Sequence, residues 1–188
     1  YWQEWGGAFE NQQRAMAKLA VIVPLTIGLI FILLYTAFNS VRYATLIIAN
    51  VPFAAIGGII SLFVSGQYLS VPAAVGFIAV FGVAMLNGIV LISFLNGLRE
   101  QGLNIRETVV QGAVLRLRPV LMTALVEILG LLPFLLATGV GSEVLRPLAT
   151  VVVGGLISST ALTLFILPLV YEWMEQRRQS QNLEGASQ

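Results

Sequence analysis

The sequence predicts an all-α integral membrane protein: a bundle of five transmembrane helices plus a short cytoplasmic amphipathic helix. Of the 188 residues, 57% are hydrophobic and 10% are charged, whereas a soluble domain carries about 25% charged residues. The mean hydropathy is +0.89. The apolar residues also gather in runs of about 20, the length that a helix needs to cross the hydrocarbon core of a bilayer.

The apolar runs predict five spans and the segments that flank them. The spans run approximately over 19–38, 43–65, 71–95, 120–138 and 148–171, within a transmembrane domain from 19 to 173. Residues 1–18 are polar and aromatic, and we expect them to be the end of a periplasmic region that leads into the first span. Residues 174–188 are expected to form a disordered cytoplasmic tail, because they are polar and poor in apolar residues.

The polar stretch before the fourth span predicts a helix over about 105–118. Asn104 and Glu107 stand at the spacing of a capping box, with Asn in place of the usual Ser or Thr. Val110, Val114 and Leu117 then fall on one helical face. This pattern favours an amphipathic helix on the cytoplasmic membrane surface. An ordinary solvated connector is the alternative.

Lysine and arginine are unevenly divided between the two sides of these spans. One set of exposed segments holds Arg42, Arg99, Arg106, Arg116, Arg118, Arg177 and Arg178. The other set holds Arg14, Lys18 and Arg146. The positive-inside tendency puts the larger set in the cytoplasm, so the N-terminus is predicted outside and the C-terminus inside. Arg14 and Lys18 lie close to the first span and oppose this orientation.

The residue types that are absent exclude several functions. The sequence has no cysteine and no histidine, and all nine acidic residues are glutamates. Disulfides and thiolate or imidazole metal sites are therefore excluded within these residues, and an intramembrane hydrolase lacks the groups for a catalytic site. We expect no enzyme activity, no cofactor and no metal site in this segment. The net charge of +1 gives no reason to expect a nucleic-acid partner.

Small residues spaced four apart predict where the helices pack. In lipid, close approach of backbones across small residues drives much of helix association. The pairs are Ala54/Gly58, Gly57/Ser61, Ala84/Gly88, Gly154/Ser158 and Gly155/Ser159. Gly57, Gly58, Gly88, Gly154 and Gly155 are therefore candidate packing positions. Pro52 and Pro133 lie inside spans and favour kinks there.

Glu127 is the only charged residue in the interior of the predicted spans. An ionisable group at membrane depth costs several kcal/mol and usually serves transport or proton movement. Thr123 lies four residues earlier on the same helical face, and Asn87 lies near the middle of the third span. We take Glu127, Asn87 and Thr123 as candidates for a proton relay. The alternative is that Glu127 is a protonated, structural residue that makes one hydrogen bond between helices.

Other polar side chains and the methionines inside the predicted spans are weaker candidates for a functional role. Ser158, Ser159, Thr160 and Thr163 form a hydroxyl-rich patch in the fifth span, although such hydroxyls usually bond to carbonyls of their own helix. Met85 and Met122 could in principle pass a soft cation. Two isolated methionines in different spans are more typical of packing.

Three stretches resemble the C-terminal half of resistance–nodulation–division efflux pumps. They are NVPFAAIGGI at 50–59, GFIAVFGVAMLNGIVLISF at 76–94, and 112–173 with its RLRPVLMTA and GSEVLRPLATVVVGG segments. The likeness is greatest to the heavy-metal-efflux branch of cobalt–zinc–cadmium type. It implies the last five of twelve spans of a proton-driven exporter of divalent heavy-metal cations in the bacterial inner membrane. It also implies a homotrimer when full length, which works with its own N-terminal half, a periplasmic adaptor and an outer-membrane channel.

Two departures from the family pattern bear on this reading. The essential proton-carrying aspartates of the superfamily lie in the N-terminal half, and this chain has no aspartate. Copper- and silver-type relatives carry a Glu near Leu86 and a Lys near Val120, where this chain is apolar. The resemblance therefore argues against a copper or silver pump. The chain is expected to be a fragment that does not transport alone, and a non-transporting membrane scaffold or assembly module is the alternative.

Overall fold

The computed structural model describes residues 7–139 and 141–185, with side chains over 13–139 and 141–178. Within these residues there are six helices and no strands. The helices are α1 (Gly7–Phe38), α2 (Val41–Ile48), α3 (Asn50–Val64), α4 (Val71–Glu100), α5 (Ile105–Leu136) and α6 (Ser142–Gly185). Five stretches are long and apolar enough to cross a membrane: Gln13–Phe38, Val41–Val64, Val71–Glu100, Ile105–Leu136 and Ser142–Arg178. The predicted all-α membrane class is confirmed.

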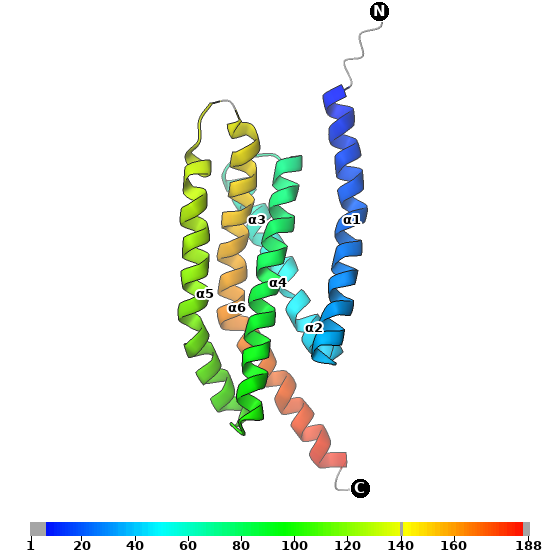
Figure 1. Ribbon diagram of the computed structural model, residues 1–188, viewed down its shortest axis with the longest axis vertical. Helices are drawn as coiled ribbons and strands as arrows, with labels where there is room; N and C mark the ends of the chain where they lie inside the picture. The colour runs from blue at the N-terminus through cyan, green and yellow to red at the C-terminus, as the bar shows by residue number, and fades with distance from the viewer. Residues whose placement is uncertain (1–6, 140, 186–188) are drawn as a thin grey trace, which may run out of the picture.

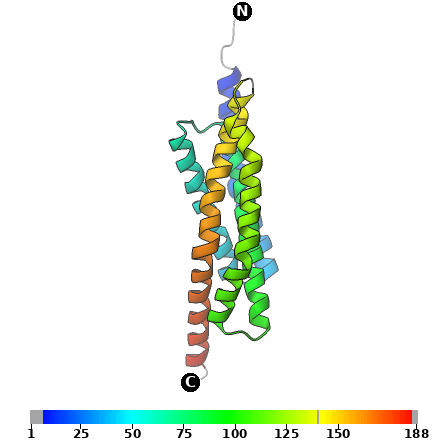
Figure 2. The same cartoon turned by 90° about the vertical axis from the view of Figure 1, so that its left-hand side faces the viewer.

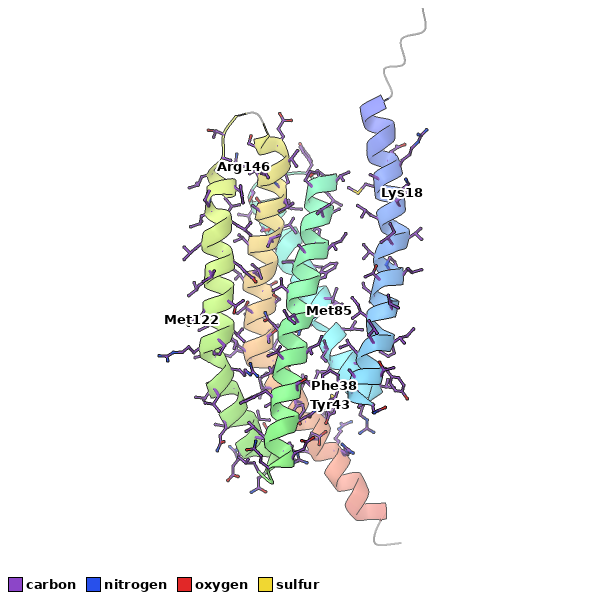
Figure 3. All side chains as sticks on the ribbon, viewed as in Figure 1. Lys18, Phe38, Tyr43, Met85, Met122 and Arg146 are labelled. Atoms are coloured by element: carbon purple, nitrogen blue, oxygen red, sulfur yellow. The ribbon has the colours of Figure 1, made fainter. Side chains whose placement is uncertain are left out.

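Helix α6 is the central element of the bundle. It packs against α2, α3, α4 and α5, and Figure 2 shows it running between α3 and α5. Helix α1 stands to one side and contacts only α2 and α4 among the described helices, as Figure 1 shows. Lys18 and Arg146 lie at the same, upper end of the bundle (Figure 3), the end opposite the lower tip of α6. These two members of the smaller basic set therefore lie at the same end of the fold.

The second span is broken into α2 and α3 just before Pro52. Ala49 joins the two helices with φ −59° and ψ −18°, and its N–H donates to the Thr45 carbonyl at 2.9 Å. A proline inside a helix removes one hydrogen bond and crowds the carbonyl four residues earlier. The Asn50 side chain, at the start of α3, is buried against α4, where Nδ2 lies 3.5 Å from the Ala84 carbonyl oxygen.

The predicted interfacial helix over 105–118 is helical but not separate. It continues through Pro119 into the fourth span as the single helix α5, which bends in its lower third (Figure 1). Its buried side is formed by Ile105, Thr108, Val109 and Gly112, whereas Val110, Val114 and Leu117 are exposed. Packing against α4 holds this segment to the bundle, because a Cβ built on Gly112 would meet the Leu95 side chain.

The segment expected to be a disordered tail also differs from its prediction. Helix α6 continues to Gly185, and 186–188 lie outside the described residues. Gln176 Nε2 donates to Glu172 Oε1 one turn earlier, at 3.1 Å. Glu175 is only 6% exposed. Over 174–178 the helix still packs against the bundle through Glu175, which contacts Tyr43 of α2 and Arg99 of α4.

The candidate packing glycines lie at close helix contacts. A Cβ built on Gly57 would lie 2.5 Å from the Gly154 carbonyl oxygen, and one on Gly154 would lie 2.7 Å from the Gly57 carbonyl oxygen. On Gly155 it would lie 2.7 Å from Val80 Cγ1. Ser61 Oγ adds a hydrogen bond to the Thr150 carbonyl at 2.8 Å. The contact between α3 and α6 is thus so close that no side chain fits at these glycines.

A polar cluster, the lower clamp, joins α2, α4 and α6 near their lower ends. The Tyr43 hydroxyl donates to Glu175 Oε1 at 2.6 Å. Arg99 Nη2 lies 3.6 Å from Glu175 Oε2 and Arg178 Nη1 lies 3.9 Å from Oε1. Tyr171 stacks on Tyr43 with ring centroids 5.8 Å apart. Figure 3 places Tyr43 where α1 turns into α2, so the clamp ties that turn to the end of α6.

The close contact between α3 and α6 predicts that a single added methyl group there lowers the stability of the fold. Gly57→Ala should lower the free energy of unfolding by about 1–3 kcal/mol, because overpacking a tight contact forces backbone shifts. Unfolding of the detergent-purified protein by a denaturing detergent measures this. Gly28→Ala is the matched control, since no atom lies within 4 Å of a Cβ built there. Equal stability of the two variants would contradict the conclusion that the contact at Gly57 leaves no room for a Cβ.

The lower clamp predicts that the Tyr43 hydroxyl stabilises the fold. Tyr43→Phe should cost about 1.5–3 kcal/mol, the range for a hydrogen bond to a charged group, and the same unfolding measurement checks it. Tyr68→Phe is the control, since Tyr68 is 90% exposed. A loss no greater than that of the control would mean that the carboxylate is held by its arginines alone.

Candidate functional site

Glu127 lies on α5 at the edge of its contact with α6. Its side chain is partly buried, and Oε2 is removed from solvent without a hydrogen-bond partner among the described residues. The next residue, Ile128, belongs to the same apolar cluster as Leu156 of α6. An ionised carboxylate there lacks the hydrogen bonds that water would give it. The described side chains thus leave Glu127 Oε2 unpaired.

The structure does not bring the other two relay candidates to Glu127. Thr123 is exposed, and its hydroxyl donates to the Pro119 carbonyl of its own helix at 2.9 Å. Asn87 lies on α4 and is partly buried. No hydrogen bond joins either residue to Glu127 in the described part of the chain. The predicted relay of three side chains is thus not assembled within this segment.

The hydroxyl-rich patch of α6 divides into two kinds of residue. Ser158 donates to the Phe53 carbonyl of α3 at 2.9 Å, and Ser159 Oγ lies 3.3 Å from the Leu156 carbonyl of its own helix. Thr160 and Thr163 are buried, yet neither Oγ1 has a hydrogen-bond partner among the described residues. The serines therefore serve packing, whereas the two threonines keep free hydrogen-bonding capacity.

Asn50 is a buried polar residue that was not predicted as part of the site. It is fully buried at the start of α3, and its Oδ1 has no partner in the described chain. Its Nδ2 would lie 2.8 Å from a Cβ built on Gly88 of α4. The absence of a side chain at Gly88 thus leaves room for the Asn50 amide group, which is the nearest neighbour, rather than for a close backbone contact. The sequence does carry a signal for this residue, since Asn50 is a polar side chain inside an apolar run, two residues before the proline that predicts a kink.

Three of these unpaired polar groups border one apolar cluster, the mid-bundle cluster. Its buried members are Ala54, Val80, Ala84, Val152 and Leu156. Asn50 lies one helical turn before Ala54, and Thr160 lies one turn after Leu156. Glu127 adjoins Ile128, which packs against the cluster. Buried polar atoms nearly always have a partner, so this region has unused capacity to bind water, an ion or another polar group.

Met85 and Met122 do not lie along one path that a soft cation could follow. Met122 is 62% exposed and points away from the bundle on the outer side of α5, whereas Met85 is buried on α4. Figure 3 labels both and shows the width of the bundle between them. In the described residues, no three histidine, cysteine, aspartate or glutamate side chains gather as a metal-binding group.

Glu175 is the one buried carboxylate among the residues with described side chains, and it was not predicted from the sequence. It had been assigned to a disordered tail, although Tyr171, Glu175 and Arg178 follow one another at spacings of four and three residues. That spacing puts all three on one helical face. In contrast to Glu127, the Glu175 carboxylate has a hydrogen bond and two arginines, so its role is accounted for by the fold.

The chain matches known proteins over nearly its whole length. Residues 1–175 match the AcrB/AcrD/AcrF family. The chain is 53% identical over 171 residues to the cobalt-zinc-cadmium resistance protein CzcA of Cupriavidus metallidurans, covering 91% of this chain and 16% of that protein. It is 50% identical over 175 residues to the nickel and cobalt resistance protein CnrA of the same organism, covering 93% of this chain and 16% of that protein.

A solved structure agrees with these relatives. The chain matches a crystal structure of a heavy metal efflux pump (crystal form II) with a TM-score of 0.81 and 54% identity, over 90% of this chain and 17% of that one. The chain therefore spans only about a sixth of the length of the proteins that it resembles. The resemblance to resistance–nodulation–division pumps of the heavy-metal branch is confirmed, and the chain belongs to the AcrB/AcrD/AcrF family.

Proposed function

We propose that this chain is the C-terminal membrane part of a proton-driven antiporter that exports divalent heavy-metal cations. The observation that carries the proposal is 53% identity to a cobalt-zinc-cadmium resistance protein over 91% of the chain. The five spans agree with such a role. Because the chain spans about a sixth of that relative, it acts only together with the rest of the pump. Transporters of this kind surround a central path with two related halves.

The apolar residues at two positions support divalent ions as the substrate. Copper- and silver-type relatives have a Glu near Leu86 and a Lys near Val120. Here Leu86 is 58% exposed on α4, and Val120 is buried on α5. Neither can carry a proton or a charge. The names of CzcA and CnrA refer to cobalt, zinc, cadmium and nickel, and these divalent metals are the first substrates to test.

Glu127 is the residue of this segment that we propose takes part in proton movement. The unpaired Glu127 Oε2 and the unpaired Thr160 Oγ1 border the same mid-bundle cluster. A carboxyl group without a fixed partner can take up and release a proton when water or a moving side chain reaches it. Thr123 and Asn87 then have indirect roles, because neither is hydrogen-bonded to Glu127 in the described part of the chain.

The remaining parts of the proposal concern assembly and orientation. The pump would be a homotrimer in the bacterial inner membrane, with a periplasmic adaptor and an outer-membrane channel as partners, as family membership implies. The N-terminus of this segment would be periplasmic and its C-terminus cytoplasmic. The concentration of arginines at the end of the bundle that bears the lower clamp supports this orientation.

Glu127→Gln in the complete pump should remove most of the pump-dependent tolerance to cobalt, zinc and cadmium. The amide keeps the size and polarity of the side chain but cannot carry a proton. Growth of a pump-deleted strain with each variant measures this, with protein levels compared by immunoblot. Glu107→Gln is the matched control, since Glu107 is an exposed glutamate on the same helix. Wild-type tolerance in Glu127→Gln would make Glu127 a structural residue.

The orientation can be tested with single cysteines in a pump cleared of its other cysteines. Tyr68→Cys should react with a membrane-impermeant maleimide in intact spheroplasts, because the loop after α3 is expected to face the periplasm. Gln101→Cys, in the loop after α4, should react only after permeabilisation. Both positions are exposed, so access differs only by side. The reverse labelling pattern would mean that the orientation in the membrane is opposite to the proposed one.

A further inference from the structure

A groove lies between α2 and the lower part of α6, at the arginine-rich end of the bundle. Its volume is about 560 Å³, and it is lined by Val41, Arg42, Thr45, Leu46, Ala49, Val170, Trp173, Met174 and Arg177. Figure 1 shows the lower part of α6 passing below α2. The groove is distinct from the mid-bundle cluster and from the lower clamp, and neither the fold nor the proposed transport uses it.

The lining of the groove is apolar inside and positively charged at its edge. The interior is formed by aliphatic side chains such as Leu46 and Val170, together with the half-exposed Trp173. Arg42 and Arg177 are exposed and supply the charge. The Arg177 guanidinium lies 3.9 Å from the centre of the Trp173 ring. This stacking fixes one charge directly beside the apolar interior.

The two arginines of the groove differ from their neighbours in having no carboxylate partner. Arg99 and Arg178 are both engaged with Glu175. Among the described residues, no ion pair joins Arg42 or Arg177 to an acidic side chain. Two unneutralised guanidinium groups at the end of membrane spans attract an anion. Each can donate two parallel hydrogen bonds to phosphate oxygens.

We propose that this groove binds an anionic phospholipid, with an acyl chain along the apolar interior and the phosphodiester between Arg42 and Arg177. Three features of the groove fit this ligand together: an apolar interior, two arginines without a carboxylate partner and the tryptophan beside them, a residue type that is enriched at membrane–water interfaces. Basic pockets between transmembrane helices bind anionic head groups in this way. A zwitterionic lipid would bring a positive group toward the arginines and would be disfavoured.

The proposal is tested on the complete pump in phosphatidylcholine nanodiscs that contain a photoactivatable phosphatidylglycerol or phosphatidylcholine with a diazirine in its acyl chain. After irradiation, cross-linked peptides are mapped by mass spectrometry. The phosphatidylglycerol probe should label α2 and the lower part of α6 more than the phosphatidylcholine probe does. Arg42→Gln with Arg177→Gln should lower this preference by about 30-fold, since each juxtamembrane arginine contributes about fivefold in affinity.

The matched control is Arg106→Gln with Arg118→Gln, which removes two exposed charges from the same end of the bundle and should keep the preference. A second variant guards against misfolding: Ala49→Phe fills the groove without changing charge and should reduce labelling of the groove by both probes. The proposal is overturned if the groove remains unlabelled in the wild-type pump, if both arginine pairs matter equally, or if Ala49→Phe has no effect.

Discussion

The close contact between α3 and α6 is the constraint on which the rest of the structure depends. In lipid, apolar side chains gain little by meeting one another, so helices associate where backbones can approach closely. Gly57 and Gly154 allow such an approach, because each faces the other's carbonyl group with no room for a Cβ. The hydrogen bonds from Ser158 to Phe53 and from Ser61 to Thr150 fasten the same seam. With α3 fixed on one side of α6, α4 and α5 complete a layer around it, and α6 becomes the axis of the bundle.

The buried Glu175 and the partly buried Glu127 have opposite surroundings in this architecture. The Glu175 carboxylate accepts a hydrogen bond from the Tyr43 hydroxyl of α2. It also lies near two arginines, Arg99 of α4 and Arg178 of its own helix. Glu127 has an unpaired oxygen beside an apolar cluster. A satisfied carboxylate holds helices in one arrangement, whereas an unsatisfied one changes its energy when its surroundings change. The lower clamp therefore adds to the α3–α6 contact in holding the helices together, whereas Glu127 is the carboxylate that can respond to a change in its surroundings.

Much of this fold could be predicted from the sequence, because hydropathy reports where lipid is the solvent. The five apolar runs and the glycine pairs are local patterns, and the structure has helices and tight contacts at those places. Hydropathy alone does not predict at which residue a helix ends. Residues 105–118 and 174–185 are polar enough to look like a surface helix and a free tail, yet both extend a span. One face of 105–118 packs against α4, and Glu175 is buried in the second segment. The partners of Glu175 could not be found from the sequence either, since Tyr43 lies 132 residues away and only the fold brings it near.

The exposed apolar surface and the unpaired polar atoms lead to different conclusions about what surrounds this segment. Helix α1 exposes Val21, Leu25 and Leu29, and lipid or another apolar helix covers such side chains equally well. Lipid cannot hydrogen-bond Asn50 Oδ1, Thr160 Oγ1 or Glu127 Oε2. Their partners must be water, an ion or polar groups from the rest of the protein, of which this chain spans about a sixth in its relatives. The polar atoms at the mid-bundle cluster are thus stronger indicators of an incomplete site than the apolar faces are, because only they carry a cost that a bilayer cannot remove.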